Sequence, residues 1–119
     1  MLNENKITLE KQGDITILNI QGDITAFSEP FLNDAYQTAS SQDADKILLI
    51  MEEDAYINSG GIAVLIQLLA QTKQRKQRIG ITGISEHFKK IFNMVGITKF
   101  AKIYSTVEVA LETLTAEPG

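Results

Sequence analysis

The stretch from position 46 to position 75, KILLIMEEDAYINSGGIAVLIQLLAQTKQR, decides the fold class. It begins with a continuous apolar run, Lys46 to Met51, which is typical of a strand covered on both faces in a parallel sheet. The acidic loop Glu52-Glu53-Asp54 follows, and an apolar helix is predicted from about Gly60 to Arg75. A buried strand that leads into such a helix predicts an α/β fold.

Shorter segments extend this alternation to both sides. Alternating apolar residues predict strands at 6–10 and 14–21, joined at Gly13-Asp14 as a hairpin. The other predicted elements are a helix from near Glu29-Pro30 to Ala39, a strand at 79–82, a helix that Ser85 caps and Gly96 ends, a strand at 101–104, and a last helix that Ser105 caps and that runs through Leu114. The order β-β-α-β-α-β-α-β-α predicts a mixed, mostly parallel sheet of about five strands with about four helices.

Length and composition narrow the class of protein. The 119 residues suit one domain over positions 1–119, with a tail after about residue 114 that we expect to fray. A net charge of −4 disfavours direct binding to nucleic acid or to an anionic membrane. The chain has no cysteine, no apolar signal core at its start and no apolar stretch of membrane-spanning length. We therefore expect a soluble cytoplasmic protein.

Residues that often carry chemistry are few. No phosphate-binding glycine motif is present, and His87 is the only histidine, without a triad signature around it. The acidic loop 52–54 lacks the ligand spacing of a calcium site, so a solvated loop is the simpler interpretation. The cations that close the long helix, Lys73, Arg75, Lys76 and Arg78, are interpreted as a solvated helix end. We expect no catalytic residue, no metal and no cofactor.

The turn Asn58-Ser59-Gly60-Gly61 is the strongest candidate for function. Asn58 or Ser59 is a natural helix N-cap, and capping alone is one interpretation. A cap does not require two glycines beside it, however, and these cost about 1–2 kcal/mol of helix propensity relative to alanine. A helix start without side chains leaves its N–H groups accessible and lets another backbone approach. A phosphate on Ser59 would be stabilised there by the helix dipole, so the turn is predicted to dock a partner protein and to be switchable.

Three segments carry a resemblance to a known family. Tyr56 to Leu65 resembles the signature of STAS domains of the bacterial anti-sigma-factor antagonist family, in which a phosphorylatable serine opens a helix. Gly22-Asp23-Ile24 is similar to the family's glycine–acidic–aliphatic strand end, and Phe92 to Ile97 to its aromatic-x-Met-x-Gly-aliphatic segment. Asn58 stands where the family has an aspartate, and Gly60 where it has a second serine or threonine. The resemblance covers nearly the whole chain and implies a STAS-like fold.

The resemblance also implies a mechanism without catalysis by this chain. The unphosphorylated antagonist would bind an anti-sigma factor that is also a serine-protein kinase, and so free a sigma factor. The kinase would phosphorylate Ser59 and release the complex, and a serine phosphatase would reset it. The residues implied in partner binding are Asp23, Ile24, Thr25, Asn58, Ser59, Gly60 and Gly61.

Three other functions stay open at this point. A constitutive scaffold or assembly domain, or a partner-switching regulator with an output other than a sigma factor, would use the same turn, and a weak homodimer would fit either. A small hydrolase that uses Ser59 would need a base that the sequence does not supply.

Overall fold

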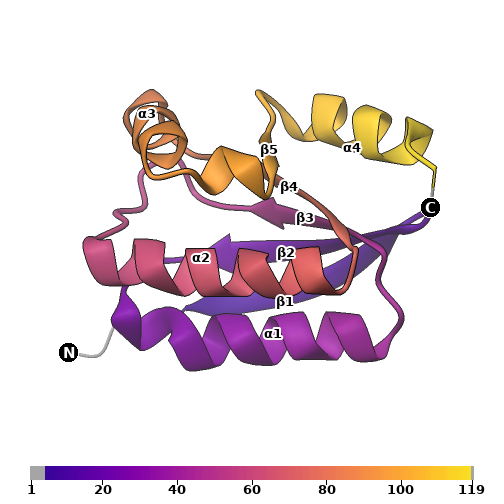
Figure 1. Ribbon diagram of the computed structural model, residues 1–119, viewed down its shortest axis with the longest axis horizontal. Helices are drawn as coiled ribbons and strands as arrows, with labels where there is room; N and C mark the ends of the chain where they lie inside the picture. Colours follow the sequence, from indigo (N-terminus) through magenta and orange to yellow (C-terminus); the bar gives the residue numbers. More distant parts are fainter. Residues whose placement is uncertain (1–4, 119) are drawn as a thin grey trace.

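The computed structural model describes residues 5–118 and contains one five-stranded sheet, ordered β1-β2-β3-β4-β5 (Figure 1). The strands are β1 (Lys6–Gln12), β2 (Ile15–Gln21), β3 (Lys46–Ile50), β4 (Arg78–Thr82) and β5 (Lys102–Ile103). The β1–β2 pair is an antiparallel hairpin that turns at Gly13, whose φ of 63° suits glycine. The remaining neighbours are parallel, which confirms the predicted mixed and mostly parallel sheet.

Helices cover both faces of this sheet. They are η1 (Ala26–Ser28), α1 (Glu29–Ser41), α2 (Ser59–Gln74), α3 (Glu86–Met94), η2 (Ile97–Lys99) and α4 (Val107–Ala116). The larger core cluster joins one face of the sheet to α1, α2 and α3 through residues such as Leu32, Leu65 and Phe92. The smaller cluster joins the opposite face to α4 through Ala110 and Leu114. The nearly continuous burial of β2 and β3 therefore reflects two cores, one on each face of the sheet, as the apolar run of β3 predicted.

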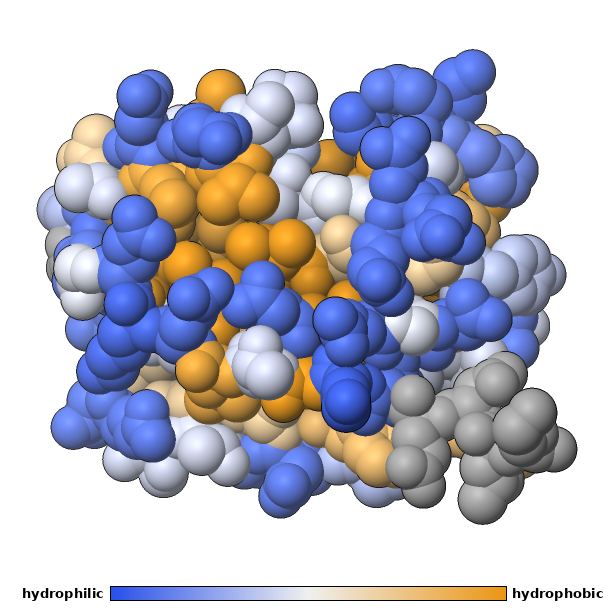
Figure 2. Space-filling model, turned by 180° about the vertical axis from the view of Figure 1, so that it is seen from behind, coloured by the Kyte–Doolittle hydropathy of each residue, from blue (hydrophilic) through white to orange (hydrophobic). Residues whose placement is uncertain are grey.

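The face that carries α4 leaves some apolar side chains only partly buried. Its partly buried apolar residues include Ile50, Val107 and Leu111. Seen from behind, apolar surface gathers over the middle of this face with hydrophilic residues around it (Figure 2). Within the described residues, no helix combines the length and the apolar character that crossing a bilayer requires.

The ends of α3 match the prediction, whereas the start of α4 does not. The Ser85 side chain accepts a hydrogen bond from the Phe88 N–H, and Gly96 ends α3 in the left-handed region at φ 86°. The predicted cap at Ser105 is wrong, because the Thr106 hydroxyl accepts the bond from the Val109 N–H, 3.1 Å away. Two adjacent hydroxyl residues satisfy the same sequence rule, and the backbone geometry selects the second.

The last helix is longer than the sequence predicted. α4 continues to Ala116, two residues past the predicted end at Leu114. The carbonyl of Glu117 accepts a hydrogen bond from the Lys46 ammonium at 2.6 Å, and the Pro118 carbonyl accepts one from Arg78 Nε at 3.0 Å. These bonds attach the residues after α4 to the starts of β3 and β4.

Candidate functional site

The backbone that leaves β2 is joined to the backbone that enters α2. Ile24 forms a parallel bridge with Ile57. The Ile24 N–H donates to the Tyr56 carbonyl at 2.9 Å, and the Asn58 N–H donates to the Ile24 carbonyl at 3.2 Å. The side chain of Ile24 is fully buried, so this residue positions the turn and cannot contact a partner through its side chain. The sequence prediction that residues 23–25 lie beside the turn is thus matched by the structure.

Two carboxylates hold the loops on either side of this junction. Asp23 Oδ1 accepts a hydrogen bond from the Tyr56 N–H at 2.9 Å, and Glu52 Oε1 accepts one from the Gly22 N–H at 2.7 Å. The acidic loop therefore includes one residue with a structural contact, whereas Glu53 and Asp54 are exposed. Negative charge consequently gathers next to the start of α2.

The first turn of α2 leaves Ser59 accessible. Asn58 is the N-cap, and its Oδ1 accepts a hydrogen bond from the Gly61 N–H at 2.8 Å. Ser59 is the first helical residue and is exposed. Within residues 5–118, no described group bonds to the Ser59 hydroxyl or accepts from the Ser59 and Gly60 N–H groups. The two N–H groups and the hydroxyl therefore lie together at the start of α2, where an anion would be stabilised.

The paired glycines have a reason that lies within the chain itself. A Cβ on Gly61 would stand 2.0 Å from the Ile24 carbonyl oxygen, and a Cβ on Gly60 would stand 3.0 Å from the Ala26 Cβ. Another backbone does approach this helix start, as the glycines predicted, but it is the 24–26 segment of the same chain. Gly61 is buried, whereas Gly60 is half-exposed beside Ser59. The glycines thus fit the turn against η1 and do not require a partner to explain them.

Thr25 is committed to local structure as well. Its hydroxyl accepts a hydrogen bond from the Phe27 N–H at 3.1 Å, while its N–H donates to Ser28 Oγ at 3.0 Å. This reciprocal capping box opens η1. Phe27, the second residue of η1, has 73% of its surface exposed.

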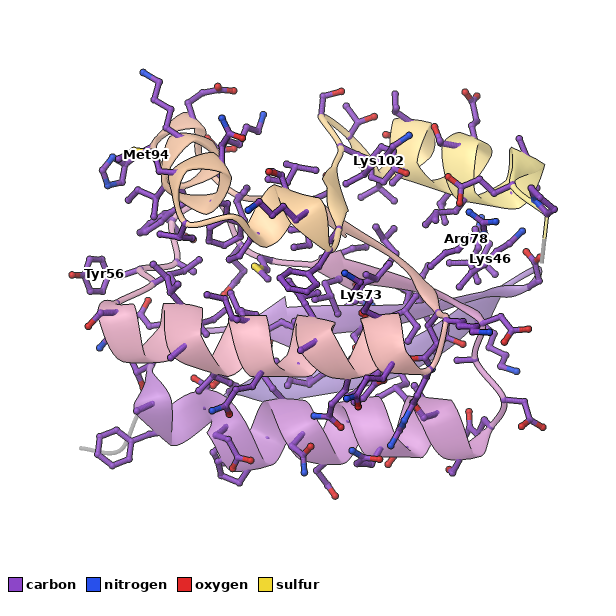
Figure 3. All side chains as sticks on the ribbon, viewed as in Figure 1. Lys46, Tyr56, Lys73, Arg78, Met94 and Lys102 are labelled. Atoms are coloured by element: carbon purple, nitrogen blue, oxygen red, sulfur yellow. The ribbon has the colours of Figure 1, made fainter. Side chains whose placement is uncertain are left out.

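Exposed apolar side chains at this end of the molecule were missed by sequence reasoning. Besides Phe27, Tyr56 is 61% exposed, Met94 83% and Val95 44%. α3 ends at Met94 and Val95 is its C-cap, so helical periodicity does not predict which way the Val95 side chain points. Tyr56 and Met94 both lie toward the end of the molecule where α2 begins (Figure 3). From the sequence alone, apolar residues in an amphipathic pattern are assigned to the core. Only the structure shows that these four side chains are exposed.

His87 lies on the same side of the molecule without joining Ser59. Its ring makes an edge contact with Phe88, 5.0 Å between centroids, and Phe88 in turn contacts Tyr56 at 6.2 Å. Within the described residues, no hydrogen bond links His87 to Ser59. Nor do three or more histidine, aspartate or glutamate side chains gather there in an arrangement that could hold a metal ion. Among residues 5–118, the arrangement offers an accessible Ser59 hydroxyl and no hydrogen-bonded base to activate it.

Comparison with known proteins identifies the family. The STAS domain model matches residues 6–110, and the chain belongs to the STAS domain family. Among curated proteins, the chain is 23% identical over 107 residues to the anti-sigma-B factor antagonist of Bacillus subtilis, a match that covers 90% of this chain and 96% of that protein. It is 20% identical over 94 residues to the anti-sigma-B factor antagonist of Listeria monocytogenes, with 79% and 82% covered.

Solved structures share the fold. An anti-sigma factor antagonist from Mycobacterium paratuberculosis superposes with a TM-score of 0.79 at 14% identity, covering 93% of this chain and 94% of that one. The Bacillus cell fate determinant SpoIIAA in its phosphorylated form gives a TM-score of 0.63 at 16% identity, with 91% and 98% covered. The five-stranded mixed sheet with four α-helices is therefore the STAS fold that the residues 56–65 predicted.

Proposed function

We propose that this chain is an anti-sigma factor antagonist whose docking is switched by phosphorylation of Ser59. In its unphosphorylated form it binds an anti-sigma factor that is a serine-protein kinase. Phosphorylation of Ser59 releases the partner, and a serine phosphatase restores the binding form. The chain itself performs no catalysis in this cycle. The names of the curated relatives support the role, since both are anti-sigma-B factor antagonists.

The observation that carries the proposal is an exposed serine surrounded by exposed apolar side chains. Ser59 opens α2, Tyr56 and Met94 lie toward the same end of the molecule, and Phe27 belongs to η1, which packs against the start of α2. Each of these three apolar side chains exposes more than half of its surface. Large apolar and aromatic side chains that are buried on association supply most of the binding energy of an interface. We take the docking surface to be the exposed residues of the segments 23–27, 56–60 and 94–95. Ser59 would then lie within a surface suited to a protein partner.

The fold would tolerate a phosphate on Ser59, whereas the complex with the partner would be destabilised by it. The N–H groups of Ser59 and Gly60 and the helix dipole stabilise an anion at this helix start. The phosphate adds about −1.5 to −2 charges next to Glu53 and Asp54. On partner binding this charge would lose its water, and any carboxylate of the partner nearby would repel it. Release therefore follows from charge and desolvation and needs no refolding of the chain.

The test measures binding to the serine-kinase anti-sigma factor of the same genome by biolayer interferometry. We expect Ser59→Ala to bind within threefold of wild type and Ser59→Asp to bind at least tenfold more weakly, a loss of about 1.4 kcal/mol or more. The matched control is Ser105→Asp, since Ser105 is also exposed and also lies just before a helix, α4. This variant should bind like wild type.

A kinase assay followed by intact mass measurement completes the test. One added phosphate is expected on wild type and none on Ser59→Ala. Tight binding by Ser59→Asp together with no phosphate on the native protein would contradict the switch. That pair of results would favour a constitutive scaffold, the role in which Asn58 and Gly60 serve only to hold the turn.

A further inference from the structure

A basic hollow lies at the other end of α2, away from Ser59. Its volume is about 620 Å³, and Lys46, Lys73 and Arg78 are drawn around it in Figure 3. Its lining residues are Asp45, Lys46, Lys73, Arg75, Lys76, Gln77, Arg78, Lys99 and Phe100. Six of the eleven lysines and arginines of the chain thus line one hollow, together with one of its fifteen carboxylates. Positive charge is concentrated there in a chain whose net charge is −4.

Ordinary structural roles account for part of this charge. Lys46 is buried and forms an ion pair with Asp14 at 2.9 Å, and Arg78 pairs with Glu117 at 3.2 Å. The C-terminal end of the α2 dipole favours nearby cations such as Lys73.

Aromatic rings account for a further part. The Lys73 ammonium lies 5.8 Å from the centre of the Phe100 ring, and the Arg75 guanidinium lies 5.2 Å from that of Tyr36. Such contacts favour a cation without neutralising its charge, so both groups stay positive toward the hollow.

Lys76 and Lys99 have no such explanation. Both are exposed, and neither forms an ion pair within residues 5–118. They come from different elements, the turn after α2 and η2, so the α2 dipole cannot account for both. Lys76 also has a φ of 57°, in the left-handed region where glycine is the favourable residue after a helix. A lysine therefore occupies a backbone position that is strained for it, and its side chain lines the hollow.

We propose that this hollow binds a small anion that carries a chain of two or more phosphoryl groups. Ammonium and guanidinium groups are the usual protein ligands of phosphate oxygens, and several converge here from β3, the α2–β4 turn and η2. The volume lies within the range of about 300–1,000 Å³ that small-molecule sites occupy. A nucleic acid duplex would need an extended basic face on the outside of the molecule, whereas these cations surround a concavity. The site lies apart from Ser59 and does not depend on the proposed docking function.

Isothermal titration of the full chain with inorganic tripolyphosphate at about 50 mM and 300 mM salt tests the proposal, because phosphate contacts weaken with salt. We expect wild type to bind tripolyphosphate at least tenfold more tightly than orthophosphate or a hexaglutamate peptide. The double variant Lys76→Glu/Lys99→Glu should lose at least tenfold in affinity. The matched control is Lys6→Glu/Lys90→Glu, which changes the net charge equally at two exposed lysines that do not line the hollow. It should bind within threefold of wild type.

Each contrary outcome has a definite meaning. No binding by wild type, equal losses in both double variants, or equal affinity for hexaglutamate would overturn the proposal; the last would assign the hollow to an acidic peptide segment. Lys76→Gly guards against misfolding, since glycine suits the backbone at φ 57°. We expect this variant to melt at a higher temperature than wild type and yet to bind tripolyphosphate at least threefold more weakly. Ser59→Asp should bind it like wild type.

Discussion

The two ends of α2 differ in charge, in packing and in the way that the sequence builds them. At the N-terminal end, Ser59 stands on a tightly packed turn beside the carboxylates of residues 52–54 and among exposed apolar side chains. At the C-terminal end, six cations surround a hollow. One helix thus separates a surface suited to a protein partner from a cavity suited to a small anion.

The difference shows that one site is formed by residues adjacent in sequence and the other by residues far apart in sequence. The turn at 56–61 is continuous in sequence, so a motif reveals it. The hollow is assembled from residues 45–46, 73–78 and 99–100, which only the parallel sheet brings together. Each of these segments by itself is interpreted as a solvated charged segment.

The largest effect is expected from an alanine at the packed end of α2. In Gly61→Ala, the new Cβ would meet the Ile24 carbonyl oxygen at 2.0 Å, and backbone on both sides prevents relief. We expect a loss of about 3 kcal/mol or more in the free energy of unfolding, measured by urea denaturation. Gly60→Ala is the graded comparison, because its Cβ would meet Ala26 at 3.0 Å. Its loss should be about 1 kcal/mol.

Equal and small losses in these two variants would mean that η1 and α2 move apart easily. The N-terminal end would then be as loosely built as the hollow, and the contrast in packing between the two ends would fail. Circular dichroism of both variants under native conditions identifies a chain that does not fold at all.

The next largest effect concerns binding and rests on the proposed docking function. Phe27→Ala and Met94→Ala remove side chains that are 73% and 83% exposed, so the free energy of unfolding should change little. Each should weaken binding to the kinase-type anti-sigma factor by about 2 kcal/mol, as expected for a buried interface anchor. Val109→Ala is the control, since Val109 is a 43% exposed apolar residue on α4. Similar losses in all three variants, measured by interferometry, would show that the docking surface lies elsewhere or has no defined position.

Rules that depend only on residues close in sequence predicted the features that such residues determine. The order of strands and helices along the chain follows from periodicity. The Ser85 cap and the helix start at Asn58-Ser59 follow from hydroxyl and amide chemistry. What tertiary contact determines was not predictable from single positions. The reason for Gly61 is a carbonyl 37 positions earlier, at Ile24. Likewise, the exposure of Phe27 depends on how η1 leaves the sheet. Lys76 and Lys99 line the same hollow only in the folded chain.

A smaller effect, of opposite sign, is expected at the basic end. Lys76→Gly relieves a left-handed conformation that costs a lysine about 1–2 kcal/mol, and part of the gain is offset by the greater freedom of glycine in the unfolded chain. We expect a net stabilisation of about 0.5 kcal/mol by urea denaturation. Gly96→Ala is the reverse change at another helix end, where φ is 86° and the new Cβ would make only ordinary van der Waals contact with the Lys99 side chain, and it should destabilise by about 1 kcal/mol. If Lys76→Gly proved destabilising, Lys76 would have a structural role. Its left-handed backbone would then no longer support a role for its charge in the hollow.

The smallest effect should be a dependence of stability on pH at the ion pair behind the hollow. A hydrogen bond from the Lys46 ammonium holds the pKa of the Asp14 carboxyl below its usual value of 3.8. A lowered pKa in the folded state contributes stability above the usual value, and that stability is lost as the pH falls through the lowered pKa. Asp14→Asn should therefore unfold at lower urea than wild type at pH 7, and the two should converge at a pH below the folded pKa. Asp34→Asn, which changes an exposed carboxylate on α1, is the control and should show no such convergence. A constant difference between Asp14→Asn and wild type at all pH values would mean that the Asp14 charge does not stabilise Lys46, and that the buried cation relies on the Glu117 carbonyl alone.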